Sequence, residues 1–263
     1  MPNYAATNLQ LFNQLLAQGY TQEDLKRIHQ TYEMARLLFS GRFGASGRTQ
    51  LSHGVGTASI LAFGDAPAHL VAAGLVHNVY NNGDFGDGGR GISEQKRTLL
   101  RETLGPEIEK EVANFAMLKW NEKNISNFLL GKGPLTPNLV FLRLADVLDH
   151  NLFGGLFYDH KIMKAKRGIS KRILPLGIQA GKALGLPSLV EELERIKREN
   201  DSPQPLAYLH EKFGVNGGFN VLPPSYAQKT FVKLLKVFAR FWPARETSES
   251  IRYLRKVIHH GLS

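Results

Sequence analysis

Apolar residues recur every three to four positions along most of the chain, which predicts an almost entirely helical protein. The first segment carries such a pattern at Leu9, Phe12, Leu15 and Leu16. Thr7 precedes it as an N-cap, and Gly19 ends it. Thr21 and Asp24 then form a capping box that opens a second helix, whose apolar face contains Ile28 and Ala35.

Further helices are expected at 52–63, 65–80, 106–120, 136–153, 171–184, 187–200, 203–213, 224–241 and 246–260. Asp65 is expected to cap the helix over 65–80, with Pro67 in its first turn. Strand signals are weak, because no segment alternates with period two between turn residues at both ends. The predicted fold class is therefore all-α, a helical bundle with additional C-terminal helices.

The glycine-rich segment 214–224 is the best candidate for a linker. It could separate a C-terminal helical pair from the main body, but an ordinary loop within one domain is the favoured interpretation. We therefore expect a single helical domain over 1–263, with a C-terminal helical extension over about 191–263.

The composition narrows the class of protein. The chain has 263 residues, 43% of them hydrophobic, and no cysteine, so it has neither a disulfide framework nor a zinc–thiolate site. The chain contains no run of 18 or more apolar residues, so no membrane span is predicted. The first residues lack the pattern of a signal peptide. We expect a cytoplasmic protein.

The formal net charge of +10 favours anionic partners. Six cations and no acid lie between His160 and Arg172. A solvated basic surface is the simplest interpretation of this stretch, and a phosphate-binding surface is the alternative. Nucleic-acid binding would rest on charge alone, because the stretch lacks interleaved aromatic residues and the chain shows no DNA- or RNA-binding motif.

Three residues of metal-binding type lie on segments that are otherwise apolar, namely His53, His77 and Asp146. Burying such side chains is costly unless they are paired or coordinated. A hydrogen-bonded core histidine would explain His77 alone, and a pair with Arg143 or His150 would explain Asp146. Taken together, two imidazoles and a carboxylate suit a divalent manganese, iron or zinc ion with positions open to water or substrate.

Three motifs in this order resemble the HD-domain superfamily, and within it the hydrolase domain of stringent-response (p)ppGpp hydrolases. Ser46-Gly47 stands six residues before His53, as in the family's Ser-Gly-x5-His opening. The segment 72–78, Ala-Ala-Gly-Leu-Val-His-Asn, is similar to the family's Ala-Ala-x-Leu-Leu-His-Asp. The segment 142–148, Leu-Arg-Leu-Ala-Asp-Val-Leu, is similar to its Lys-Leu-Ala-Asp-Arg-Leu.

The resemblance covers about residues 20–190 and implies an HD-like helical core. It also implies metal-dependent hydrolysis of a phosphorylated or other anionic, nucleotide-like small molecule. By the same resemblance, His53, His77 and Asp146 would be metal ligands.

Two departures from the family's pattern bear on catalysis. Asn78 stands where the family has the aspartate of its His-Asp pair, so it would offer only its carbonyl oxygen as a ligand. The acidic pair that handles water in the family aligns with Asn81 and Asn82, which cannot act as general bases.

Other residues could replace these lost functions. Asp84, in the glycine-rich loop 81–91, and Asp149 are candidate proton acceptors. Arg48 and Arg90, together with Asn81 and Asn82, are candidate contacts for the anionic substrate.

Two alternatives remain open. The first is a catalytically degenerate HD domain that binds a ligand or partner without turnover, which Asn78 and the Asn81–Asn82 pair favour. The second is an HD-fold, metal-dependent oxygenase. That branch uses extra histidines between the His-Asp pair and the last Asp, and residues 79–145 contain none. His150, His160 or His210 would then have to serve.

Overall fold

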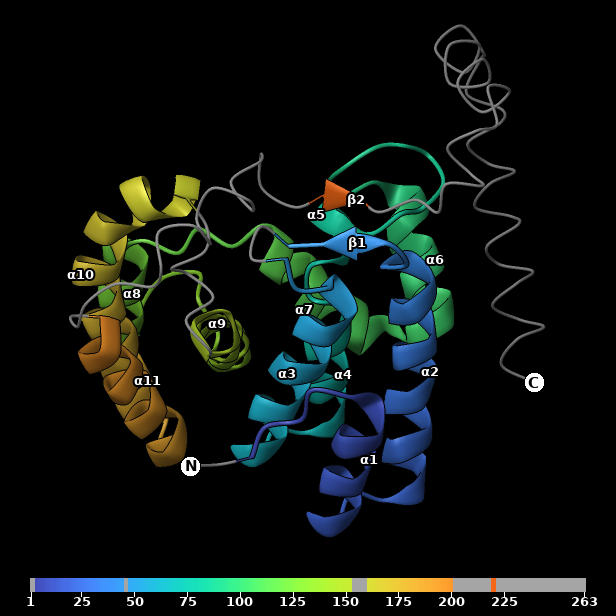
Figure 1. The fold of residues 1–263 in the computed structure, drawn as a ribbon, viewed down its shortest axis with the longest axis horizontal. Coiled ribbons are helices and arrows are strands. Elements are labelled where there is room, and N and C mark those ends of the chain that lie inside the picture. Colours follow the sequence, from blue (N-terminus) through green and yellow to red (C-terminus); the bar gives the residue numbers. More distant parts are fainter. Residues whose placement is uncertain (1–2, 45–46, 153–159, 201–218, 221–263) are drawn as a thin grey trace, which may run out of the picture.

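The computed structural model describes residues 3–44, 47–152, 160–200 and 219–220, and in these residues the protein is an all-α bundle, as the sequence predicts (Figure 1). Its helices are α1 (Asn8–Ala17), α2 (Gln22–Leu38), α3 (Gln50–Phe63), α4 (Ala68–Val76), α5 (Val79–Asn82), α6 (Glu94–Leu104), α7 (Pro106–Ala116), α8 (Glu122–Leu129), α9 (Pro137–Asn151), α10 (His160–Ala183) and α11 (Pro187–Asn200).

One short strand pair accompanies the helices. Strand β1 (Arg42–Phe43) pairs antiparallel with β2 (Phe219–Asn220), which falls within the segment 214–224 considered above as a linker or loop. The helices expected at 203–213, 224–241 and 246–260 lie outside the described residues.

Helices α3 and α4 form the centre of the bundle and pack against each other. Helix α2 covers α4, and α9 packs on α3. In Figure 1, α9 is seen end-on between the α3–α4 pair and the outer helices α10 and α11. Residues from the first, middle and later parts of the chain therefore meet in one core.

Two glycines allow α3 and α4 to approach closely. A Cβ atom at Gly54 would lie 2.4 Å from the backbone oxygen of Leu75, and one at Gly74 would lie 3.2 Å from the Cα of Ala58. Backbone atoms cannot rotate away from such a contact, so any larger residue at Gly54 forces the helices apart. This close approach brings the start of α3 beside the end of α4.

The capping residues predicted for the first two helices are confirmed. Thr7 and Thr21 each accept a hydrogen bond from the backbone amide three residues later, which completes a capping box in both helices. The predicted apolar face of α1 is wrong in part, because Leu9 and Leu16 are 71% and 59% exposed. Leu15 is fully buried as predicted, together with Leu11 one turn earlier, and Phe12 is partly buried against the core.

The single helix expected over 65–80 is also wrong. Asp65 has a φ of 57° in the turn after α3, and Pro67 is the N-cap of α4. Helix α4 ends at Val76, and His77 and Asn78 form a turn before α5. Helices α6 and α8 are not predicted by the pattern of apolar residues. Helix α6 is strongly polar, and α8 spans only eight residues, so neither carries a long apolar pattern.

A buried carboxylate joins α5, α6 and α7. Glu109 on α7 is 2% exposed and accepts hydrogen bonds from the Tyr80 hydroxyl and from the guanidinium groups of Arg97 and Arg101. Burial raises the pKa of Glu109, but the bonds from Arg97, Tyr80 and Arg101 outweigh it and lower this pKa below its usual 4.5. These contacts fix the helices on both sides of the loop 83–93.

Replacing Gly54 by alanine tests the contact between α3 and α4. We expect Gly54→Ala to reduce the free energy of unfolding by about 2–3 kcal/mol, because the added methyl group meets backbone. Urea unfolding followed by circular dichroism measures this loss. Gly89→Ala is the matched control, since its nearest neighbour is the flexible side chain of Asp87. An equal loss in both variants would contradict the interpretation.

The Glu109 network predicts a pH dependence of stability. A carboxylate whose pKa is lower in the folded state stabilises the fold above its unfolded pKa, and this contribution is lost as the pH falls through the folded value. We expect Glu109→Gln to cost about 2 kcal/mol at pH 7. The difference from the wild type should shrink as the pH falls below about 4. A difference that stays constant between pH 7 and pH 3 would show that charge is not the cause.

Candidate metal centre

His53 on α3, His77 at the end of α4 and Asp146 on α9 converge inside the bundle. The Nε2 atom of His53 lies 3.1 Å from the Nε2 atom of His77 and 3.1 Å from Oδ1 of Asp146. The Nε2 atom of His77 lies 3.3 Å from the same Oδ1. The three residues are 5%, 1% and 1% exposed. They come from segments far apart in the sequence, and together they form a group that could hold a metal ion.

The outer ring nitrogens fix the orientation of both imidazoles. Nδ1 of His53 lies 2.6 Å from Oδ2 of Asp149, and Nδ1 of His77 lies 2.8 Å from the backbone oxygen of Gly74. Each acceptor is satisfied when Nδ1 carries the proton and donates it, which leaves the lone pair on Nε2. The two lone pairs and the Asp146 oxygen then point at one small volume. A cation or a shared proton there relieves their repulsion, and this donor set fits a divalent transition metal.

Asp149 is held in place from two sides. Besides contacting His53, its Oδ2 accepts a hydrogen bond of 2.8 Å from Nη1 of Arg48. Gly56 makes room for this carboxylate, because a Cβ atom at Gly56 would lie 1.8 Å from Oδ1 of Asp149. The contacts of Asp149 are those of a residue that orients His53.

Asp146 has two further partners on its own helix. Nη1 of Arg143 donates to its Oδ2, and Nε2 of His150 lies 3.3 Å from its Oδ1. Both pairings considered for Asp146 from the sequence therefore occur, in addition to its contacts with His53 and His77. The side chain of His150 is 43% exposed, so it stands on the solvent side of the group.

Burial and neighbouring charges shift the pKa values of this group. Burial lowers the pKa of His53, but hydrogen bonds with Asp146 and Asp149 outweigh it and raise this pKa to about 9. Burial raises the pKa of Asp146, but Arg143 and His150 lead the contributions that hold it well below its usual range. For His150, desolvation and then the charge of His53 lower the pKa. Metal binding at neutral pH should therefore displace a proton from His53.

The glycine-rich loop after α5 is anchored by a buried lysine, Lys96, which is not among the site residues predicted from the sequence. Lys96 is 1% exposed, pairs with Asp87 at 3.0 Å, and donates to the backbone oxygen of Gly89 at 2.9 Å. Its ammonium group also lies 5.0 Å from the ring centre of Phe85. Lys96 lies three residues after Ser93, the N-cap of α6, a helix that the apolar pattern did not predict, so only the burial of its side chain reveals its role.

The remaining site residues predicted from the sequence are not part of the group of His53, His77 and Asp146. Asp84 pairs with Arg42 at 2.8 Å and accepts from the amide of Gly86. Arg48 is bound to Asp149, as described above. The other four lie on or beside α5 and its loop: Asn78, which makes no cap hydrogen bond, Asn81 and Arg90, which are exposed, and Asn82, which is half-buried.

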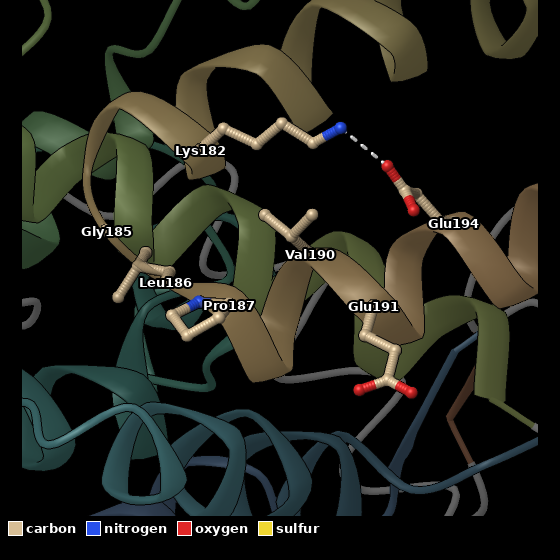
Figure 2. A pocket seen from close by; sticks show the side chains of 7 residues that line it. All are labelled: Lys182, Gly185, Leu186, Pro187, Val190, Glu191 and Glu194. Carbon is tan, nitrogen blue, oxygen red and sulfur yellow. Dashed lines mark ion pairs between the residues drawn. The ribbon is translucent and has the colours of Figure 1, made fainter.

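A separate pocket lies where α10 turns into α11 (Figure 2). Lys182 and Glu194 form an ion pair of 2.8 Å across it, and Val190 lies beside this pair. None of its lining residues belongs to the group of His53, His77 and Asp146. No helix in the described ranges is long and apolar enough to cross a membrane.

The contact between Asp149 and His53 predicts an effect on metal affinity. We expect Asp149→Asn to weaken binding of Mn²⁺ or Zn²⁺ by about 10–100-fold, because a neutral amide holds the imidazole less firmly than a carboxylate does. Isothermal titration calorimetry measures the change. Asp65→Asn, in the exposed turn after α3, is the control. An unchanged affinity in Asp149→Asn would refute an orienting role.

Comparison with known protein families matches one part of the chain. Residues 37–119 match a family model described as Domain of unknown function (DUF6817). The matched region includes His53 and His77 and ends before α9, which carries Asp146. No curated protein matches the chain. Two of the three converging residues therefore lie in a recognised domain whose description names no activity.

Proposed function

We propose that the chain is a divergent HD-domain protein, a metal-dependent hydrolase of a phosphorylated or other anionic, nucleotide-like small molecule. The observation that carries the proposal is the convergence of two oriented Nε2 atoms and one carboxylate oxygen in a buried site. The order His53, His77-Asn78, Asp146 along the chain agrees with the HD resemblance.

In this proposal His53, His77 and Asp146 hold a manganese, iron or zinc ion, and Asn78, the residue after His77, would offer only the oxygen of its amide. A bound divalent ion would polarise a phosphoryl oxygen and lower the pKa of a water molecule. The residues of the chain orient the imidazoles, exclude water from the inner side and supply positive charge. The net charge of +10 and the exposed Arg90 suit an anionic substrate.

A second candidate, binding without turnover, is favoured by the surroundings of the two candidate proton acceptors. Asp149 is engaged by His53 and Arg48, and Asp84 is engaged by Arg42. General-base catalysis needs a carboxylate or imidazole within reach of the attacking water. Because both carboxylates already have strong partners, retention of the metal with loss of hydrolysis is a coherent alternative.

Metal content tests the proposal most directly. We expect the purified wild type to carry close to one transition-metal ion per chain, and His53→Ala and Asp146→Ala to carry little, since each removes a ligand. Elemental analysis measures the content, with circular dichroism as the check of folding. His29→Ala, on the exposed side of α2, is the matched control and should keep the metal. A wild type without metal after loading with Mn²⁺, Fe²⁺ or Zn²⁺ would refute the proposal.

Turnover separates the candidates once metal binding is established. Hydrolysis of a panel of nucleotides and phosphoesters by the loaded wild type supports the hydrolase, and metal without turnover supports the degenerate domain.

In Asn78→Asp, a large gain in metal affinity would support degeneracy, whereas loss of the native activity would make Asn78 functional. Oxygen consumption with Fe²⁺ is the readout for the oxygenase alternative.

A further inference from the structure

His150 occupies a position that its spacing from Asp146 explains. Residues four apart on a helix lie on the same face one turn apart, so Asp146 and His150 both face the core group. Nε2 of His150 lies 3.3 Å from Oδ1 of Asp146. His53 and His77 approach this same oxygen at 3.1 Å and 3.3 Å. Three imidazole nitrogens therefore surround one carboxylate oxygen.

The ring of His150 is also held against the group. Its centroid lies 4.1 Å from that of His53, and the two rings are inclined by only 30°. The stacked arrangement places His150 over the outer side of the His53 ring, and its side chain is 43% exposed. His150 thus lies between the buried group and solvent, where a fourth ligand would complete the site.

An ordinary helix pair, in which Nε2–H of His150 donates to Oδ1 of Asp146, explains their own contact but not the approach of His53 and His77 to the same oxygen. Oδ2 of Asp146 already accepts from Arg143, so Oδ1 alone faces the three imidazoles. Nδ1 of His53 and Nδ1 of His77 each face an acceptor, so in the neutral form both rings turn the lone pair of Nε2 toward Oδ1 and toward each other. A divalent cation bound to Oδ1 would accept these two lone pairs, and His150 with its proton on Nδ1 would offer a third, because a carboxylate oxygen and a neutral imidazole are both metal ligands.

The neighbouring Asn78 does not supply the missing ligand equally well. It is a neutral amide in the turn between α4 and α5, and its side chain makes no capping bond. An amide oxygen is a weak ligand for a borderline cation, whereas a neutral imidazole is a strong one. An i, i+4 pair of ligands on one helix is also a recurrent way to bind such a metal.

We propose that His150 is the fourth protein ligand, so that the centre consists of His53, His77, His150 and Asp146. This inference rests on the proposed metal centre and adds its ligand set. Three imidazoles and one carboxylate select a borderline transition ion such as Fe²⁺, Co²⁺ or Zn²⁺ over Mg²⁺, which prefers oxygen ligands.

The ligand count is measured on the full chain loaded with Co²⁺. X-ray absorption should find three imidazole ligands in the wild type and two in His150→Ala, with a changed visible spectrum of the Co²⁺ complex. Affinity for Co²⁺ in calorimetry should fall at least about 100-fold, the upper end of losses seen for residues that only support a ligand. His29→Ala should change none of these values, because His29 packs against Phe12 away from the group.

The outcomes separate this inference from the proposed function. If the wild type binds Co²⁺ through two imidazoles and His150→Ala keeps the same affinity, His150 is not a ligand and the metal centre of His53, His77 and Asp146 stands. If the wild type binds no transition metal, both proposals fail. His150→Gln is the second variant should His150→Ala not fold, and the imidazole count of the wild type needs no variant.

Discussion

The contact between Gly54 and the backbone of Leu75 sets the geometry on which the candidate centre depends. His53 directly precedes Gly54, and His77 follows Leu75 by two residues, so the distance between the two helices fixes the distance between the two imidazoles. A helix pair separated by ordinary side chains has axes 8–10 Å apart, and larger residues at this contact would increase the separation. The glycine is therefore needed for the site as much as for the packing.

The buried polar group costs free energy that the apolar core must offset. Asp146 and Asp149 are each 1% exposed, and burying an ionised carboxylate is expensive unless every oxygen finds a partner. Arg143 and Arg48 each donate to one of these carboxylates from the more exposed side. A protein selected for stability alone would fill this volume with apolar side chains, so the arrangement favours a function at this place.

The sequence predicted those features that depend on neighbouring residues. Capping boxes at Thr7 and Thr21 are local, because donor and acceptor lie three residues apart. The break at His77 depends instead on how α4 meets α3, and the pattern of apolar residues continues through it. The convergence of His53, His77 and Asp146 followed from a resemblance of motifs, since no local rule relates residues that are 93 positions apart.

The contacts of Asp149 and Asp84 also depend on residues far away in the sequence and could not be predicted from it. Each was a plausible proton acceptor by its distance in sequence from the other site residues. Their partners, His53 with Arg48 for Asp149 and Arg42 for Asp84, come from distant segments of the chain. The role of a carboxylate depends on the residues that contact it in the fold, and the composition of the chain does not predict those contacts.

Asn78, at the position where the HD family that the chain resembles has an aspartate, would also change the charge of the proposed centre. In the metal-bound form, the two positive charges of the ion would be balanced by Asp146 and Asp149, and Arg143 and Arg48 would add two more positive charges. A carboxylate at position 78 would lower this total by one unit, and a third imidazole as the fourth ligand leaves it unchanged. The site would then be strongly cationic on a chain whose net charge is +10. Because opposite charges attract, such a centre would favour an anionic ligand whether or not that ligand is hydrolysed.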